Sequence, residues 1–347
     1  MLGRTGNAFM LVGPDGRVLG ASDTAAAALG FETGAALTDL EPRALAARFT
    51  PETAEGHDER LPAARWLADG RDERVLRFRD PLDGWDRWAL LKMMPGPLGD
   101  TPKGRLCVVQ DITPFRRREQ AARLLDEATL RLTRALTPER VFEHAAVTAV
   151  PVLADETVVV DLGPDGLLLP AAWYLPGPSS ATRAQALVRG LAPLLADVVR
   201  GGRVLLLKPV RGEREERRSM LLAPVRHARE TLALVILAMA ADTGRAHHPS
   251  DRRLAEQLGE RIGRALADAR LQASERRRLQ AAEEREAMLA DLGSELRTQL
   301  PALLSACDRL EDRLPESERR VLRTIREQSR RLNATVDRLF TRDYRVY

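Results

Sequence analysis

The sequence predicts an α+β multidomain protein that ends in a long helix and a two-helix hairpin. Its 347 residues exceed one ordinary domain. Residues 7–113 and 138–250 alternate short apolar runs with Gly, Pro and Asp turns, which is typical of strands. Residues 251–343 instead carry apolar side chains three or four positions apart, which predicts helices.

The first region predicts an antiparallel sheet with a short helix inserted. A hairpin is expected over 9–19, because two apolar runs flank a Pro-Asp-Gly turn. A short helix with a Ser or Asp cap follows at 23–29 and ends near a glycine. Alternating residues predict a strand pair at 74–94 with its turn at 82–84, and 104–110 predicts one more strand.

The second region predicts the same kind of fold. A charged linker helix over 115–136 enters it, and a helix over 138–153 precedes the strand ETVVVDL. Residues 219–240 read as two antiparallel strands around a charged turn, and the next helix is expected to begin at 249–251.

The last region predicts a helical hairpin that dimerises. Its two stripes are heptad-like, and a lone hairpin would leave too much of the seam exposed. We therefore expect a homodimer through residues 285–343 that forms a four-helix bundle. The stripes are Leu289, Leu292, Leu296, Leu300, Leu303, Cys307 and Leu310, then Leu322, Ile325, Ser329, Leu332, Val336 and Leu339.

Composition excludes several classes of protein. The longest apolar run, 232–241, is half of what a bilayer crossing needs, so we expect no membrane insertion. Two cysteines cannot build a disulfide framework, which predicts a reduced, cytoplasmic protein. The net charge is +4, but arginines and acids are interleaved, so we expect no nucleic-acid partner. A nucleic-acid-binding regulator remains an alternative that rests only on the pI of 9.5.

Two regions resemble sensor domains. The stretch 9–31, the Trp-containing strand pair and GRLCVVQDIT (104–113) resemble a PAS domain, with Ser22 where that family usually has Asn. The stretch 219–238 and the helix at 247–271 resemble a GAF domain. The resemblance implies a PAS-like domain at 1–114, a linker helix at 115–137, a GAF-like domain at 138–271, a dimerisation hairpin at 272–343 and a tail at 344–347.

The segment MLADLGSELRTQLPALL (288–304) resembles the H-box of sensor histidine kinases, Ser-His-Glu-Leu-Arg-Thr-Pro-Leu. It aligns without gaps, and it places Ser294 at the histidine position, Glu295 at the acid and Thr298 at the threonine. Gln299 replaces the family's proline, and Pro301 follows two residues later, where it is expected to kink the helix.

The departures argue against kinase chemistry. Histidine kinases need an imidazole to accept the phosphoryl group, and none of the five histidines lies beyond residue 248. The chain also carries no recognisable ATP-binding domain, so we expect no autokinase activity. The expected function is a degenerate kinase-like scaffold, or pseudokinase, that binds a response regulator or a partner histidine kinase. The alternatives are a response-regulator phosphatase using Glu295 and Thr298, and a truncated two-component sensor histidine kinase.

No cofactor or metal site is predicted, and a small-molecule ligand in either sensor domain stays open. Cys107 is expected to pack on a core strand, and His57 and His144 are lone histidines without a haem-site pattern. His247 and His248 look like an exposed, capped turn. The tryptophans, expected in a core or a pocket wall, are Trp66, Trp85, Trp88 and Trp173.

Overall fold

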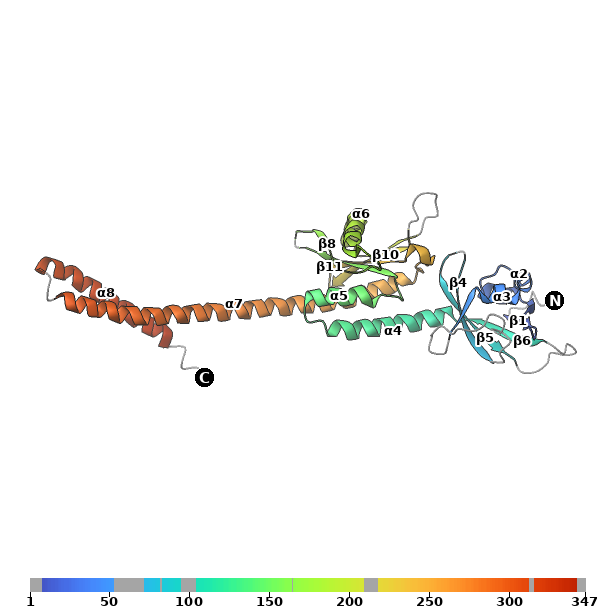
Figure 1. Cartoon of the computed structure of the whole chain (residues 1–347), viewed down its shortest axis with the longest axis horizontal. Coiled ribbons are helices and arrows are strands. Elements are labelled where there is room, and N and C mark those ends of the chain that lie inside the picture. Colours follow the sequence, from blue (N-terminus) through green and yellow to red (C-terminus); the bar gives the residue numbers. More distant parts are fainter. Residues whose placement is uncertain are drawn as a thin grey trace. The chain divides into compact units, whose positions relative to one another are not determined.

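The computed structural model contains two compact units, residues 1–270 and 271–347. The first holds two antiparallel sheets with their helices, and the second is helical (Figure 1). The described residues are 8–52, 72–81, 83–94, 104–163, 165–208, 218–311 and 315–341. Predictions that fall outside them concern His57, Trp66, Leu82, Pro164, Leu314 and the tail 344–347.

Six strands form the first sheet, and every neighbouring pair is antiparallel in the order β2-β1-β6-β5-β4-β3. The predicted hairpin is β1 and β2, where Gly16 takes the positive φ of 81° that the tight turn requires. The strands are β1 (Phe9–Val12), β2 (Val18–Ala21), β3 (Phe49–Glu52), β4 (Glu73–Arg79), β5 (Asp86–Met93) and β6 (Arg105–Asp111).

Three short helices cover this sheet: α1 (Asp23–Ala28), α2 (Gly34–Thr38) and α3 (Pro42–Ala46). Ser22 caps α1, because its hydroxyl oxygen accepts a hydrogen bond from the Ala25 amide at 3.2 Å. The same oxygen accepts one from the Phe9 amide at 3.1 Å, so Ser22 also ties the helix to β1. The fully buried Leu29 and Leu37 place the apolar faces of α1 and α2 in the sheet's core.

The second sheet has five strands in the order β8-β7-β11-β10-β9. Its strands are β7 (Glu156–Leu162), β8 (Leu168–Tyr174), β9 (Leu205–Leu207), β10 (Met220–His227) and β11 (Glu230–Ala238). The predicted pair at 219–240 is β10 and β11, which are paired along their whole length. The sheet's helices are α4 (Thr113–Thr133), α5 (Pro138–Thr148) and α6 (Ser180–Gly201), and a 3-10 turn, η2 (Ala241–Thr243), follows β11.

The prediction of a helix over 138–153 is wrong at its C-terminal end, since α5 stops at Thr148. Pro151 explains the early stop. Proline has no backbone N–H, and it disfavours the helical conformation of the residue before it.

Helices cover both faces of the second sheet (Figure 1). Side chains of α4, α5 and the start of α7 (Asp251–Glu311) share one apolar core with Val159 and Val235. Helix α6 packs on the other face against Val158 and Ile236. Alternate residues of β7 therefore point into two different cores, which accounts for its run of three valines at 158–160.

Two glycines let α7 lie directly against the backbone of β10. A Cβ atom on Gly259 would collide with the carbonyl oxygen of Pro224, and one on Gly263 would collide with that of Arg226. The two glycines are four residues apart, so they share one helix face. The start of α7 is thus positioned by main-chain contact with the sheet.

The second unit is a hairpin made by the end of α7 and by α8 (Glu316–Thr341). Pro301 lies inside α7, and the helix continues for ten residues beyond it to Glu311. The buried seam between the two helices contains Leu300, Cys307, Leu322 and Val336.

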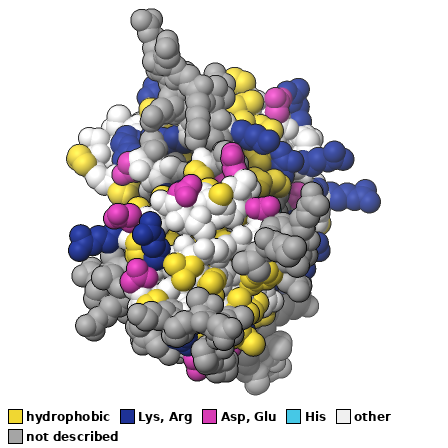
Figure 2. Space-filling view, turned by 90° about the vertical axis from the view of Figure 1, so that its right-hand side faces the viewer, with side chains coloured by type: hydrophobic (Ala, Val, Ile, Leu, Met, Phe, Trp, Pro, Cys, Tyr) yellow, Lys and Arg dark blue, Asp and Glu magenta, His cyan; other side chains and the backbone are white. Residues whose placement is uncertain are grey.

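Surface charge follows the mixture seen in the sequence. On the face shown in Figure 2, basic and acidic side chains lie among hydrophobic ones. Within the part of the chain that the structure describes, no helix combines the length and the apolar character that a bilayer crossing needs.

Candidate functional site

The H-box-like residues lie on the exposed side of α7 in the second unit. Ser294, Glu295 and Thr298 are all exposed, whereas Leu300 faces the buried seam. Ser294 and Thr298 lie one helical turn apart, and the Thr298 hydroxyl donates a hydrogen bond to the Ser294 carbonyl at 3.0 Å. The Glu295 carboxylate accepts one from the Gln299 side chain at 3.0 Å. These side chains are therefore bonded along their own helix.

The hairpin carries a second apolar stripe that its own seam does not cover. On α7 the stripe repeats every seven residues, and on α8 Ile325 and Leu332 repeat it at 45% and 49% exposure. A heptad repeat keeps these side chains on one side of each helix. The α7 members are Leu289, Leu296, Leu303 and Leu310, which are 37–51% exposed.

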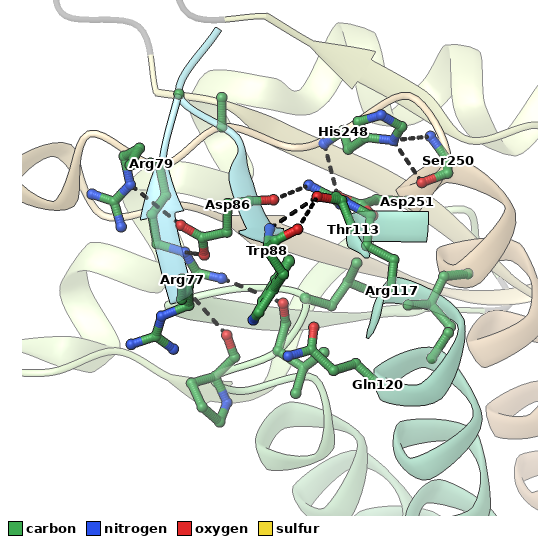
Figure 3. Close-up of a pocket in the computed structure, with 18 of the residues that line it drawn as sticks. Arg77, Arg79, Asp86, Trp88, Thr113, Arg117, Gln120, His248, Ser250 and Asp251 are labelled. Atoms are coloured by element: carbon green, nitrogen blue, oxygen red, sulfur yellow. Dashed lines mark hydrogen bonds and ion pairs between the residues drawn. The ribbon is translucent and has the colours of Figure 1, made fainter. Parts of the chain in front are cut away.

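A cavity of about 820 Å³ lies within the first unit (Figure 3). Its walls come from β4, β5, the first turns of α4 and α7, and the segments 151–153 and 245–250. We call it the inter-sheet cavity. Trp88, 3% exposed, and Phe78, 4% exposed, contribute to its apolar wall.

Ion pairs among the lining residues connect β5 to its neighbour β4 and to a segment distant in the sequence. Asp86 on β5 pairs with Arg79 on β4 at 3.5 Å and with Arg245 at 3.6 Å. Arg245 also pairs with Asp155 at 2.5 Å, and Arg79 donates a hydrogen bond to the Thr243 carbonyl. Arg245 therefore joins the first sheet to the segment that opens β7.

Arg117 joins α4 to the start of α7. Its guanidinium pairs with the Asp251 carboxylate at 3.4 Å and donates to the Asp86 carbonyl at 3.1 Å (Figure 3). Asp251 in turn accepts a hydrogen bond from the His248 amide at 2.8 Å. Burial lowers the pKa of Arg117 and raises that of Asp251, so desolvation outweighs their mutual attraction.

The expectation of an exposed turn at His247 is wrong, because this side chain is only 3% exposed. Its Nδ1 lies 2.9 Å from the Ser219 hydroxyl and its Nε2 lies 3.0 Å from the Leu153 carbonyl. A carbonyl can only accept, so Nε2–H donates to it and Nδ1 accepts from the serine. Burial lowers the pKa of His247 to about 4. Burial therefore keeps the imidazole neutral, and its two hydrogen-bond partners are ones that a local sequence pattern cannot show.

His248 stays partly exposed beside the cavity. Its ring makes an edge contact with Trp85, with 4.4 Å between centroids, and its Nδ1 lies 2.6 Å from the Ser250 hydroxyl. His144 is half-buried on α5, where its Nδ1 lies 2.8 Å from the Arg131 carbonyl. No group of three or more His, Cys, Asp or Glu among the described residues has the geometry to hold a metal ion.

Cys107 lies on β6 and is fully buried, as expected for a packing residue. Burial raises the pKa of its thiol to about 12, which keeps it protonated and unreactive. Trp88 is buried and Trp173 packs against the core under α6, in line with their expected roles.

Sequence reasoning missed the inter-sheet cavity. Its lining residues span positions 48 to 257, and in the sequence its arginines are members of an interleaved mixture of basic and acidic residues. The available signal is the arginine run at 116–118 in the first turn of the predicted linker helix.

No protein-family model matches this chain, and no curated protein matches it. Solved structures similar to it include the GAF domain of an Acinetobacter phosphoenolpyruvate-protein phosphotransferase (15% identity, 45% of this chain and 95% of that one, TM-score 0.33). The GAF domain of the Escherichia coli potassium sensor histidine kinase KdpD gives 15% identity, 44% and 98% coverage, and a TM-score of 0.31. Bacteriophytochrome RpBphP3 from R. palustris is 13% identical; the match covers 86% of this chain and 66% of that one, with a TM-score of 0.39. Scores this low carry no argument about function.

Proposed function

We propose that this chain is a signal-transduction protein of the sensor histidine kinase type with a degenerate catalytic end. Its first sheet would act as a PAS-like sensor, its second as a GAF-like sensor, and its hairpin as a homodimeric docking platform. Two separate antiparallel sheets, connected by α4, support consecutive sensor domains. The expected partner is a response regulator or an intact histidine kinase.

The observation that carries the proposal is the division of the hairpin into two apolar faces. One face closes the hairpin through Leu300 and Val336, which are 7% and 4% exposed. The other leaves heptad-spaced leucines in water, and Leu303 is 45% exposed. Burying such a stripe against the same stripe of a second copy completes a four-helix bundle.

A scaffold fits this hairpin better than a phosphatase does. Ser294 cannot form the phosphoramidate that an imidazole forms, so autophosphorylation on this helix is not expected. A phosphatase would use the Thr298 hydroxyl to orient water, but that hydroxyl already donates its hydrogen to the Ser294 carbonyl. The phosphatase alternative predicts faster loss of aspartyl phosphate from a receiver domain, abolished by Thr298→Ala.

Signal transfer would follow the continuity of α7. The helix begins at Asp251, where Arg117 connects it to α4 and β5, and it runs on to residue 311. A ligand or partner that moved α4 would therefore act on the first turn of α7. The same helix supplies half of the hairpin, so the change would reach the docking platform.

The oligomeric state of the full chain tests the platform. Light scattering at micromolar concentration should give a dimer, and Leu303→Arg should give a monomer, because it places two charges in the proposed seam. Ser305→Arg is the matched control, since residue 305 lies about 200° further round the helix and is exposed. A monomeric wild type would refute the platform.

Two activity measurements complete the test. The full chain with radioactive ATP and magnesium should take up no stable label. Calorimetric titration with receiver domains should detect binding that Leu303→Arg weakens. Stable self-labelling would overturn the proposed loss of kinase function.

A further inference from the structure

The inter-sheet cavity has a strongly basic lining. Seven arginines and two aspartates face it, an excess of five positive charges. Neither proposed sensor fold nor the hairpin uses this charge. A cavity of about 820 Å³ is in the range that encloses a small molecule.

The aspartates compensate only part of the charge. Asp86 is shared by Arg79 and Arg245, Arg245 also pairs with Asp155 outside the lining, and Asp251 pairs with Arg117. Arg118 and Arg253 also line the cavity, and neither belongs to an ion pair within the described residues. Both are exposed, so they can turn toward a ligand without breaking an existing contact.

A buried donor in the cavity wall lacks an acceptor. The Nε–H of Arg117 is buried and meets no hydrogen-bond partner among the described residues. Leaving such a group unpaired is unfavourable, so an acceptor oxygen that reaches it would be favoured. The ion pair between Arg117 on α4 and Asp251, the first residue of α7, at 3.4 Å places this guanidinium beside the N-termini of both helices.

Two long helices also direct their N-termini at the cavity. Thr113 and Arg117 come from the first turns of α4, and Ser250 and Arg253 flank the start of α7. Helix N-termini carry partial positive charge, which favours phosphate. The Thr113 amide already donates to the Asp111 carboxylate at 2.8 Å and the His248 amide to Asp251 at 2.8 Å, so the helix dipoles and not free amides make this contribution. Helix ends and arginines therefore act in the same direction.

We infer that the inter-sheet cavity binds a small metabolite that carries two or more phosphate groups. Arg117, Arg118 and Arg253 would bind the phosphates, because guanidinium groups form paired hydrogen bonds with phosphate oxygens. The apolar wall at Trp88 and Phe78 would receive the organic part of the molecule. A bound ligand would bridge α4 and α7 and so report to the start of the helix that continues into the hairpin.

Calorimetric titration of the full chain with inorganic triphosphate, in magnesium-free buffer at low salt, tests this inference. Wild type should bind one triphosphate per chain, and Arg118→Gln/Arg253→Gln should weaken binding at least tenfold. Arg134→Gln/Arg252→Gln is the control, since it removes the same charge from exposed positions outside the lining, one directly after the end of α4 and one on α7. The control should bind within twofold of wild type.

Three results would overturn the inference. These are no binding by wild type up to millimolar triphosphate, an equal loss in both double variants, and citrate binding as tightly as triphosphate. Equal loss would mean non-specific attraction, and tight citrate binding would mean a carboxylate site. Unchanged melting temperatures confirm that the variants fold. The measurement does not depend on the hairpin, so failure of the docking platform would leave it intact.

Discussion

His247 is a titratable side chain that lies buried beside the second sheet, where the fold keeps it neutral. Burial is the main cause of its lowered pKa, and Arg245 also opposes a positive charge, whereas the hydrogen bond to the Leu153 carbonyl raises the pKa. Both ring nitrogens have neutral hydrogen-bond partners, Ser219 and Leu153. Its folded pKa of about 4 lies below the unfolded value of 6.5. The unfolded chain therefore binds more protons between these values, and stability must fall as pH drops through this window.

The size of this loss follows from the two pKa values. Each pKa unit is worth about 1.4 kcal/mol, so acidification from pH 6.5 to 4 should remove about 3 kcal/mol of stability. His247→Gln should flatten the fall in melting temperature that circular dichroism records between pH 7 and 4.5. His227→Gln, on the exposed β10–β11 turn, should keep the wild-type slope. Equal slopes for wild type and His247→Gln would contradict this account.

At the scale of elements, the contact between α7 and β10 depends on glycine. Alanine at Gly259 or Gly263 would place a Cβ atom against a main-chain carbonyl, which cannot move as a side chain can. Overpacking of this kind costs about 1–3 kcal/mol. A Cβ atom added to Gly190 on α6 would meet no atom within 4 Å, so alanine fits there without a collision.

We expect Gly263→Ala to lower the denaturant midpoint of the first unit and Gly190→Ala to leave it unchanged or raise it. The gain at Gly190 should be about 0.5–1 kcal/mol, because alanine favours a helix over glycine. Tryptophan fluorescence during guanidinium unfolding provides the measurement. A stabilising Gly263→Ala would show that α7 does not lie against the sheet backbone.

The elements that sequence reasoning predicted are those whose signals are local. The β1–β2 hairpin has its turn glycine, α1 has its Ser22 cap, and β10–β11 has two apolar runs around a charged turn. His247 was misread because its partners lie 28 and 94 residues away. The inter-sheet cavity was invisible for the same reason: folding, and not spacing, brings its arginines together.

At the scale of the whole molecule, the two units should unfold differently. The first unit has an apolar core at each sheet. The second unit buries one apolar face in its seam and leaves the other, the uncovered stripe, exposed within a single chain. If a second copy covers that stripe, stability of the second unit depends on protein concentration by mass action. Stability of the first unit does not.

Scanning calorimetry of the full chain at two concentrations tests this difference. A tenfold rise in concentration adds about 1.4 kcal/mol to dimer stability, which should raise the melting temperature of the second unit by a few degrees. The transition of the first unit should stay in place. Leu296→Ala should lower only the concentration-dependent transition, because residue 296 belongs to the uncovered stripe. If the melting temperatures of both transitions were independent of protein concentration, the exposed leucines would not pair with a second copy.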